Sequence, residues 1–348
     1  MKNKKRKLNV LGVCAGAGVA LYPFMGSKYF RVIGNVEPRS VFYTKDDEHW
    51  KANFEGVPMV RSLNELKPRR VDVLIGHPDC GDSSILRMSR AKKSGQPGEN
   101  HSILLFRQAL KKLRPKVFLM ENLPGLLKAF PIEKWQELLP EYLISSLIAP
   151  VTLWGNSQES RKRLVMVGVL KSSGPKTLLF SLPDWPEPGK YPVYPAEHFE
   201  LPETENVELG HVREPMEKLC NLYYGDKRQV TYREAKEIWT NELPNSSRWP
   251  VGGKMKNQPG VSKHIEGQPP YTVRKQNRQF SSSGLVLSPR EMANIQGLPV
   301  SYKLIIKKSN SIYWINKMRV AVTKTMPMEI ASWLKREITK QHQKWKDK

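Results

Sequence analysis

The segment Leu8-Asn-Val-Leu-Gly-Val-Cys-Ala-Gly-Ala-Gly18 joins an apolar run to a glycine-rich turn. The run has the length of a buried strand, and the glycines let the backbone that follows approach a ligand closely. Further apolar runs alternate with amphipathic stretches up to about residue 170, which predicts an α/β fold with a mostly parallel, Rossmann-like sheet covered by helices. The predicted strands are Leu8–Val13, Tyr29–Asn35, Val71–Gly76, Lys116–Met120 and Leu164–Leu170, and Ser102–Leu113 is a predicted helix.

An acidic residue, Glu37, ends the second predicted strand and follows the glycine-rich turn by about 20 residues. A carboxylate at that place can accept hydrogen bonds from ribose hydroxyls, so the turn and Glu37 together predict a site for an adenosine-containing cofactor. Taken alone, the turn is equally typical of a tight turn without a ligand. A phosphate-binding loop for ATP is disfavoured, because no Gly-Lys-Ser/Thr follows and Val19 occupies the third glycine position.

Two reactive side chains follow later strands of the predicted sheet. Cys80 ends Asp72-Val-Leu-Ile-Gly-His-Pro-Asp-Cys80, and Glu121 ends an apolar strand before Asn122. Since parallel strands end at one edge of a sheet, a nucleophilic thiolate and a carboxyl group could act on the same ring. Burial would raise the pKa of Glu121 and let it hold a proton. The alternatives are a buried, inert Cys80 and a Glu121 paired with a surface lysine.

The composition favours a nucleic acid as partner. The 348 residues include 57 Lys and Arg against 33 acidic residues, a net charge of +24, and such a surplus favours a polyanion, with nucleic acid ahead of an anionic membrane. No apolar run approaches the roughly 20 residues of a membrane span. The three cysteines show no metal-ligand or disulfide pattern, which predicts a reducing, cytoplasmic location without a bound metal. A monomer is expected.

The order of these segments resembles the cytosine-5 DNA methyltransferase family. Six motifs carry the resemblance: Cys14-Ala-Gly-Ala-Gly18, His77-Pro-Asp-Cys80, Glu121-Asn122-Leu123, Ser160-Arg161-Lys162-Arg163 through Gly168, Gln268-Pro-Pro-Tyr-Thr272, and Leu287-Ser-Pro-Arg-Glu291 through Gln296-Gly-Leu-Pro299. The last motif also begins with the signals of a helix start, because Ser288 is a good N-cap and is followed by a proline and by Glu291.

The resemblance implies an S-adenosylmethionine-dependent methyltransferase sheet with a smaller, loop-rich target-recognition domain. Residues 1–170 and 286–348 would form the catalytic domain, and residues 171–285 would read double-stranded DNA. The protein would act in a bacterial cell or a phage-infected host, with restriction-modification as its setting. The implied cofactor-binding residues are Cys14, Ala15, Gly16, Ala17, Gly18, Glu37, Pro38, Pro78, Arg319 and Val320.

The resemblance also implies the roles of four catalytic residues. Cys80 would attack C6 of a cytosine flipped out of the duplex, and Glu121 would engage N3. Arg163 would hold O2 of the base and support Glu121, and Arg161 would bind phosphate or order the loop after Cys80. C5 would then accept a methyl group.

Three departures from the family pattern leave alternatives open. Asp79 and Asp82 flank the thiol, Cys14 replaces the usual phenylalanine, and Arg319-Val-Ala-Val-Thr323 replaces a Gly-Asn-Ala/Ser-Val-Pro turn. One alternative is a modified S-adenosylmethionine whose acidic arm pairs with Arg319. The others are a catalytically weak DNA-binding relative and an RNA cytosine methyltransferase.

Overall fold

The structure is a computed structural model. The chain forms two compact units. The first comprises Met1–Pro150, Lys162–Glu187 and Val322–Lys348, and the second comprises Val151–Arg161 and Pro188–Ala321. The structure describes residues 7–38, 46–67, 70–78, 101–158, 161–171, 184–201, 261–263, 267–270, 278–280, 287–305, 332, 333 and 336.

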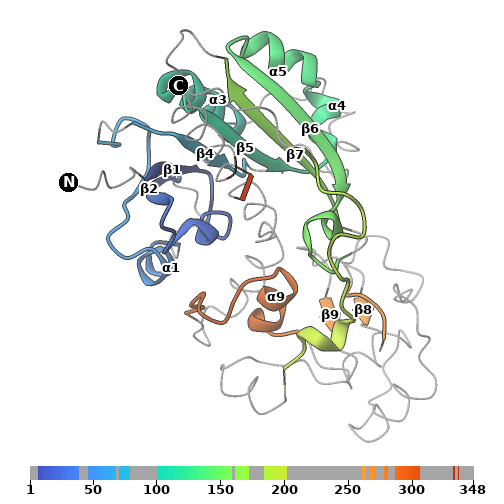
Figure 1. The fold of residues 1–348 in the computed structure, drawn as a ribbon. Helices are drawn as coiled ribbons and strands as arrows, with labels where there is room; N and C mark the ends of the chain where they lie inside the picture. Colours follow the sequence, from blue (N-terminus) through green and yellow to red (C-terminus); the bar gives the residue numbers. More distant parts are fainter. Residues whose placement is uncertain are drawn as a thin grey trace, which may run out of the picture. The chain divides into compact units, whose positions relative to one another are not determined.

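A seven-stranded sheet forms the centre of the first unit, in the order β3-β2-β1-β4-β5-β7-β6 (Figure 1). Its strands are β1 (Leu8–Val13), β2 (Phe30–Val36), β3 (Met59–Val60), β4 (Val73–Gly76), β5 (Val117–Asn122), β6 (Tyr142–Pro150) and β7 (Lys162–Leu170). The first five strands pair in parallel, and β7 runs antiparallel to both β5 and β6. The predicted α/β fold with a mostly parallel sheet is confirmed.

The five predicted strands are all present, with ends that differ by two residues or fewer. β3 and β6, the two edge strands, were not predicted. β3 has only two residues, and the residues of β6 alternate poorly between buried and exposed, with Leu143 and Ile148 both exposed. An edge strand of this kind lacks the periodic burial that makes a strand recognisable in sequence.

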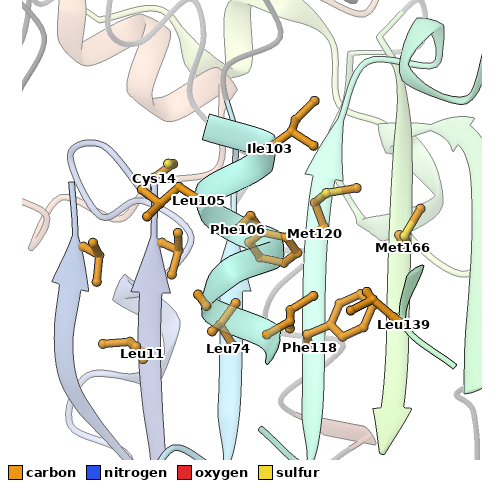
Figure 2. Close-up of a cluster of buried hydrophobic side chains, with 14 of the residues drawn as sticks. Leu11, Cys14, Leu74, Ile103, Leu105, Phe106, Phe118, Met120, Leu139 and Met166 are labelled. Atoms are coloured by element: carbon orange, nitrogen blue, oxygen red, sulfur yellow. The ribbon is translucent and has the colours of Figure 1, made fainter. Parts of the chain in front are cut away.

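The helices of the first unit are α1 (Asp46–Asn53), α3 (His101–Leu113), α4 (Gly125–Ala129) and α5 (Ile132–Leu138), with a short 3-10 turn, η1 (Tyr22–Phe24). Helix α3 lies against the sheet, and Figure 2 shows Phe106 pointing from it toward β4 and β5. The rings of Phe106 and Phe118 pack edge to face, with their centroids 5.9 Å apart. Gly76 provides room for this helix, because a side chain there would collide with the Phe106 ring.

The second unit contains η2 (Val151–Trp154), η3 (Ala196–Phe199), β8 (Val261–Lys263), β9 (Arg278–Phe280) and α9 (Pro289–Ile295). The predicted start of α9 is confirmed, since the Ser288 hydroxyl accepts from the Glu291 N–H and the Glu291 carboxylate accepts from the Ser288 N–H.

The division into units differs from the one expected from sequence, which placed residues 286–348 with the sheet. Helix α9 belongs to the second unit, because its side chains and backbone bond there. Glu291 accepts from the Leu201 N–H at 2.9 Å, and the Ile295 carbonyl accepts from Asn156 Nδ2 at 2.6 Å. Of the predicted last helix, 327–340, the structure describes residues 332, 333 and 336, which are helical, and the predicted helix 231–242 lies outside the described residues.

Candidate active site

The candidate site lies at one edge of the sheet, where the parallel strands β1, β2, β4 and β5 all end. The glycine-rich turn follows β1, Glu37 follows β2, His77 follows β4 and Glu121 lies near the end of β5. Because these strands are parallel, their carboxyl ends meet at the same edge. Open α/β sheets bind their ligands at this edge.

The turn after β1 is built from backbone in the left-handed region. Cys14, Gly16 and Gly18 have φ angles of 55°, 55° and 81°. The Gly18 N–H donates to the Ala15 carbonyl at 2.9 Å, and the Cys14 N–H donates to the Val36 carbonyl at 2.9 Å. A cysteine in this region costs about 1–2 kcal/mol relative to a relaxed backbone, so the turn is held by its bonds to β2 rather than by local preference.

Glu37 is bound directly to this turn. The Gly16 N–H donates to Glu37 Oε2 at 2.8 Å, and the Glu37 residue is 5% exposed. A carboxylate can accept about four hydrogen bonds, and ribose hydroxyls are donors that it can bind. The strand-end acceptor beside an open-backbone turn fits the adenosine part of a cofactor, as the sequence predicted.

The remaining predicted cofactor residues at this edge differ in their surroundings. Gly18 packs against α1, because a Cβ there would overlap the Phe54 ring and approach Trp50 within 2.9 Å. Gly18 therefore has a packing role in addition to any contact with ligand. Pro38 is half-buried beside Glu37. Arg319 and Val320 lie outside the described residues.

Glu121 is held between two nitrogen-bearing side chains. It is 2% exposed, Arg163 Nε lies 2.9 Å from its Oε1, and His77 Nδ1 contacts its Oε2. The antiparallel strand β7 explains the first contact. Val165 pairs with Glu121 in the β5–β7 register, and Arg163 lies two residues away on the same face of β7.

The backbone that leads to Cys80 is fixed by Asn122. Its Nδ2 donates to the Pro78 carbonyl at 3.1 Å, and its Oδ1 accepts from the Leu123 N–H at 2.8 Å. The His77 N–H also donates to the Val13 carbonyl at 3.3 Å. Pro78 is buried, and Cys80 itself lies outside the described residues. His77 and Asn122 were part of the quoted motifs, but no role was predicted for either of them.

Arg161 lies in the second unit and is 1% exposed. Its N–H donates to the Gln158 carbonyl at 3.0 Å, and its carbonyl accepts from the Val151 N–H at 2.9 Å. Both roles expected for Arg161, binding phosphate and ordering the loop after Cys80, stay predictions.

Among the residues that the structure describes, no group of three or more His, Cys, Asp or Glu side chains could hold a metal ion. In the same described part of the chain, no helix combines the length and the apolar character needed to cross a membrane.

Several solved structures share this fold. A methyltransferase of Entamoeba histolytica, EhMeth, has a TM-score of 0.62 and 11% identity, with 96% of this chain and 99% of that chain covered. A putative DNA modification methyltransferase encoded within an E. coli prophage has a TM-score of 0.58 and 18% identity, with 96% and 100% covered. The DNMT2 of Spodoptera frugiperda, as a triple mutant, has a TM-score of 0.60 and 13% identity, with 94% and 99% covered. At these identities the likeness concerns the fold alone.

Sequence comparison gives a more specific result. A curated relative, the Type II methyltransferase M.Bpa9945I of Bacillus paralicheniformis, is 31% identical over 105 residues. That match covers 30% of this chain and 23% of the relative, so it spans less than a quarter of the relative's length. The family model described as C-5 cytosine-specific DNA methylase matches residues 9–335, nearly the whole chain. The chain belongs to the C-5 cytosine-specific DNA methylase family.

Proposed function

We propose that this protein transfers a methyl group from S-adenosylmethionine to C5 of cytosine in DNA, through a covalent bond between Cys80 and C6. The observation that carries the proposal is the environment of Glu121. This buried carboxyl group ends β5 between Arg163 and His77, beside the strand that leads to Cys80. Glu121 is thus a buried carboxyl group with two nitrogen-bearing partners, on the strand next to the one that precedes Cys80 in the chain.

The chemistry explains why these groups belong together. C5 of cytosine is a poor nucleophile until a thiolate adds to C6 and a proton or strong hydrogen bond reaches N3. Cys80 would form the bond to C6, and Glu121 would supply the proton to N3. The guanidinium of Arg163 has five N–H donors, so it can hold Glu121 and donate to O2 of the base as well.

S-adenosylmethionine would supply an electrophilic methyl group bound to a sulfonium. The turn Cys14–Gly18 and Glu37 would hold its adenosine part, as the bond from Gly16 to Glu37 supports. The alternative donor with an acidic arm depends on Arg319, outside the described residues. The ordinary donor is therefore proposed.

Double-stranded DNA is the proposed substrate, because the family is defined by DNA methylation and the chain carries a net charge of +24. C5 and C6 are inaccessible in a stacked duplex, so the cytosine would be flipped into the site. A purely DNA-binding relative is disfavoured, since binding alone has no use for Cys80, Glu121 and Arg163 together. The segment 171–285 stays the proposed reader of the target sequence, and a monomer is the proposed state.

The proposal is tested by trapping the adduct. Duplexes from a random-sequence pool in which deoxycytidine is replaced by 5-fluorodeoxycytidine are incubated with S-adenosylmethionine, because fluorine at C5 cannot leave as the proton does. We expect the wild type to form a complex that survives denaturing electrophoresis and Cys80→Ser to form none. Cys220→Ser serves as the matched thiol control and should trap like the wild type. Equal trapping by Cys80→Ser would show that another group is the nucleophile.

A further inference from the structure

His77 lies directly after β4, and its side chain contacts the carboxyl group that the proposed reaction uses. Its Nδ1 contacts Glu121 Oε2, whereas Arg163 Nε faces Oε1. The two oxygens therefore have unlike partners. Arg163 stays protonated at every physiological pH, but an imidazole gains and loses a proton in that range. No role for His77 follows from the sequence.

The position of His77 is fixed by the sheet. Strands β4 and β5 are parallel neighbours with Gly76 opposite Met120, so the next residues along, His77 and Glu121, lie side by side. The backbone is bound on both sides of the imidazole, by the His77 N–H to the Val13 carbonyl and by the Pro78 carbonyl to Asn122. The contact with Glu121 is therefore built into the strand pairing and does not depend on a loop.

The two side chains differ in their access to water. The side chain of His77 is 21% exposed, and that of Glu121 is 3% exposed. Glu121 must carry a proton before the reaction begins, and a buried carboxyl group needs a route by which that proton reaches it from solvent. The imidazole contacts both the carboxylate and the solvent, so it can carry a proton between them.

We infer that His77 is a positioning residue for Glu121, which holds Oε2 and passes to it, from solvent, the proton that Glu121 presents to N3 of cytosine. The inference rests on the proposed function. One proton, shared by Glu121 and His77 before reaction, moves to N3 as the bond between sulfur and C6 forms. C5 then takes the methyl group from the sulfonium, whose S–CH3 bond breaks, and releases its own proton to solvent. As the bond between sulfur and C6 breaks, the proton on N3 returns to the pair, so the pair ends the cycle as it began.

The surrounding charges explain why a second base is needed. Arg163 faces Glu121 from β7 and favours its ionised form, which opposes the protonated state that the reaction uses. The acidic Asp79 and Asp82 follow in the sequence on either side of Cys80 and lie outside the described residues. When two coupled groups share a proton, the pair retains it to a higher pH than the more acidic member would alone.

Substitution of His77 separates its two actions. His77→Asn places an amide nitrogen near the position of imidazole Nδ1, so it keeps a donor for Glu121 but cannot take up a proton. His77→Ala removes both. The measurement is the single-turnover rate of methyl transfer to DNA as a function of pH, with S-adenosylmethionine saturating.

We expect the break in the rate profile that marks loss of the proton shared by Glu121 and His77 to move to lower pH by about one to two units in His77→Asn, because an ordinary imidazole releases its proton about two units above an ordinary glutamate. The other break, which marks titration of the Cys80 thiol, should stay in place. His77→Ala should show the same shift with a lower rate at every pH. His101→Asn, an exposed histidine at the start of α3, is the control and should keep the wild-type profile.

A rate profile whose breaks both stay at the same pH in His77→Asn and His77→Ala would overturn the inference. Thermal unfolding and S-adenosylmethionine binding show whether each variant is folded. If His77→Asn or His77→Ala does not fold, His77→Gln, which also keeps an N–H donor, takes its place. If the wild type forms no 5-methyldeoxycytidine, the proposed function fails and the inference fails with it. If product forms and the profile is unchanged, only the inference fails.

Discussion

Two buried carboxylates stand at the same edge of one sheet, and they are held in different ways. Glu37, after β2, accepts a hydrogen bond from the backbone N–H of Gly16. Glu121, at the end of β5, faces the side chains of Arg163 and His77. Both are nearly inaccessible, at 5% and 2% exposed, so burial does not distinguish them. The groups that bind the two carboxylates do differ.

The different partners of Glu37 and Glu121 suit two different roles. The Gly16 N–H orients one oxygen of Glu37, and a backbone N–H has no charge to gain or lose. Charged and titratable partners make the protonation of Glu121 responsive to its surroundings, which is the property of a group that moves a proton in a reaction. On this comparison we propose cofactor binding for Glu37 and chemistry for Glu121.

The largest effect is expected from Glu121→Gln. The amide keeps the shape of the side chain but cannot give its proton to N3, so kcat should fall by about 10²–10⁴-fold, the usual contribution of general acid catalysis. The KM for S-adenosylmethionine should stay near the wild-type value. Single-turnover kinetics with labelled S-adenosylmethionine measure both. A variant with full kcat and weak cofactor binding would reverse the assignment.

A smaller effect, on the binding of S-adenosylmethionine rather than on kcat, is expected from Glu37→Gln. Its amide oxygen can still accept from the Gly16 N–H, so the turn should keep its form. Hydrogen bonds to a charged group are stronger than neutral ones by about 1–1.5 kcal/mol, which corresponds to about tenfold weaker binding of S-adenosylmethionine. Calorimetric titration measures that affinity, and Glu121→Gln is the reciprocal control. Unchanged affinity together with reduced kcat would remove Glu37 from the cofactor site.

The fold was largely predictable because its strands are continuous apolar runs, and the turn before Gly18 stands out by its glycines. The edge strand β6 was missed, since its half-exposed residues carry no clear period. The start of α9 was predictable because a capping box is local in sequence. Its place in the second unit was not, because that depends on bonds to Leu201 and Asn156, which are distant in the chain.

The site was predictable only in part, because some of its contacts depend on how distant segments pair. Cys80 and Glu121 stand at strand ends, and strand ends are visible in sequence. The support of Glu121 by Arg163 was expected from the family resemblance alone, and the structure shows the contact. The contact with His77 requires that β4 and β5 be neighbours in one particular register, which no local pattern specifies.

The central claim is that this chain methylates C5 of cytosine in DNA, with Cys80 as the nucleophile. The most direct measurement is mass spectrometry of the nucleosides of random-sequence duplex DNA after incubation with S-adenosylmethionine and either the wild type or Cys80→Ser. The account predicts 5-methyldeoxycytidine from the wild type and none from the variant. Unmodified DNA from the wild type, or equal 5-methyldeoxycytidine from both proteins, would contradict it.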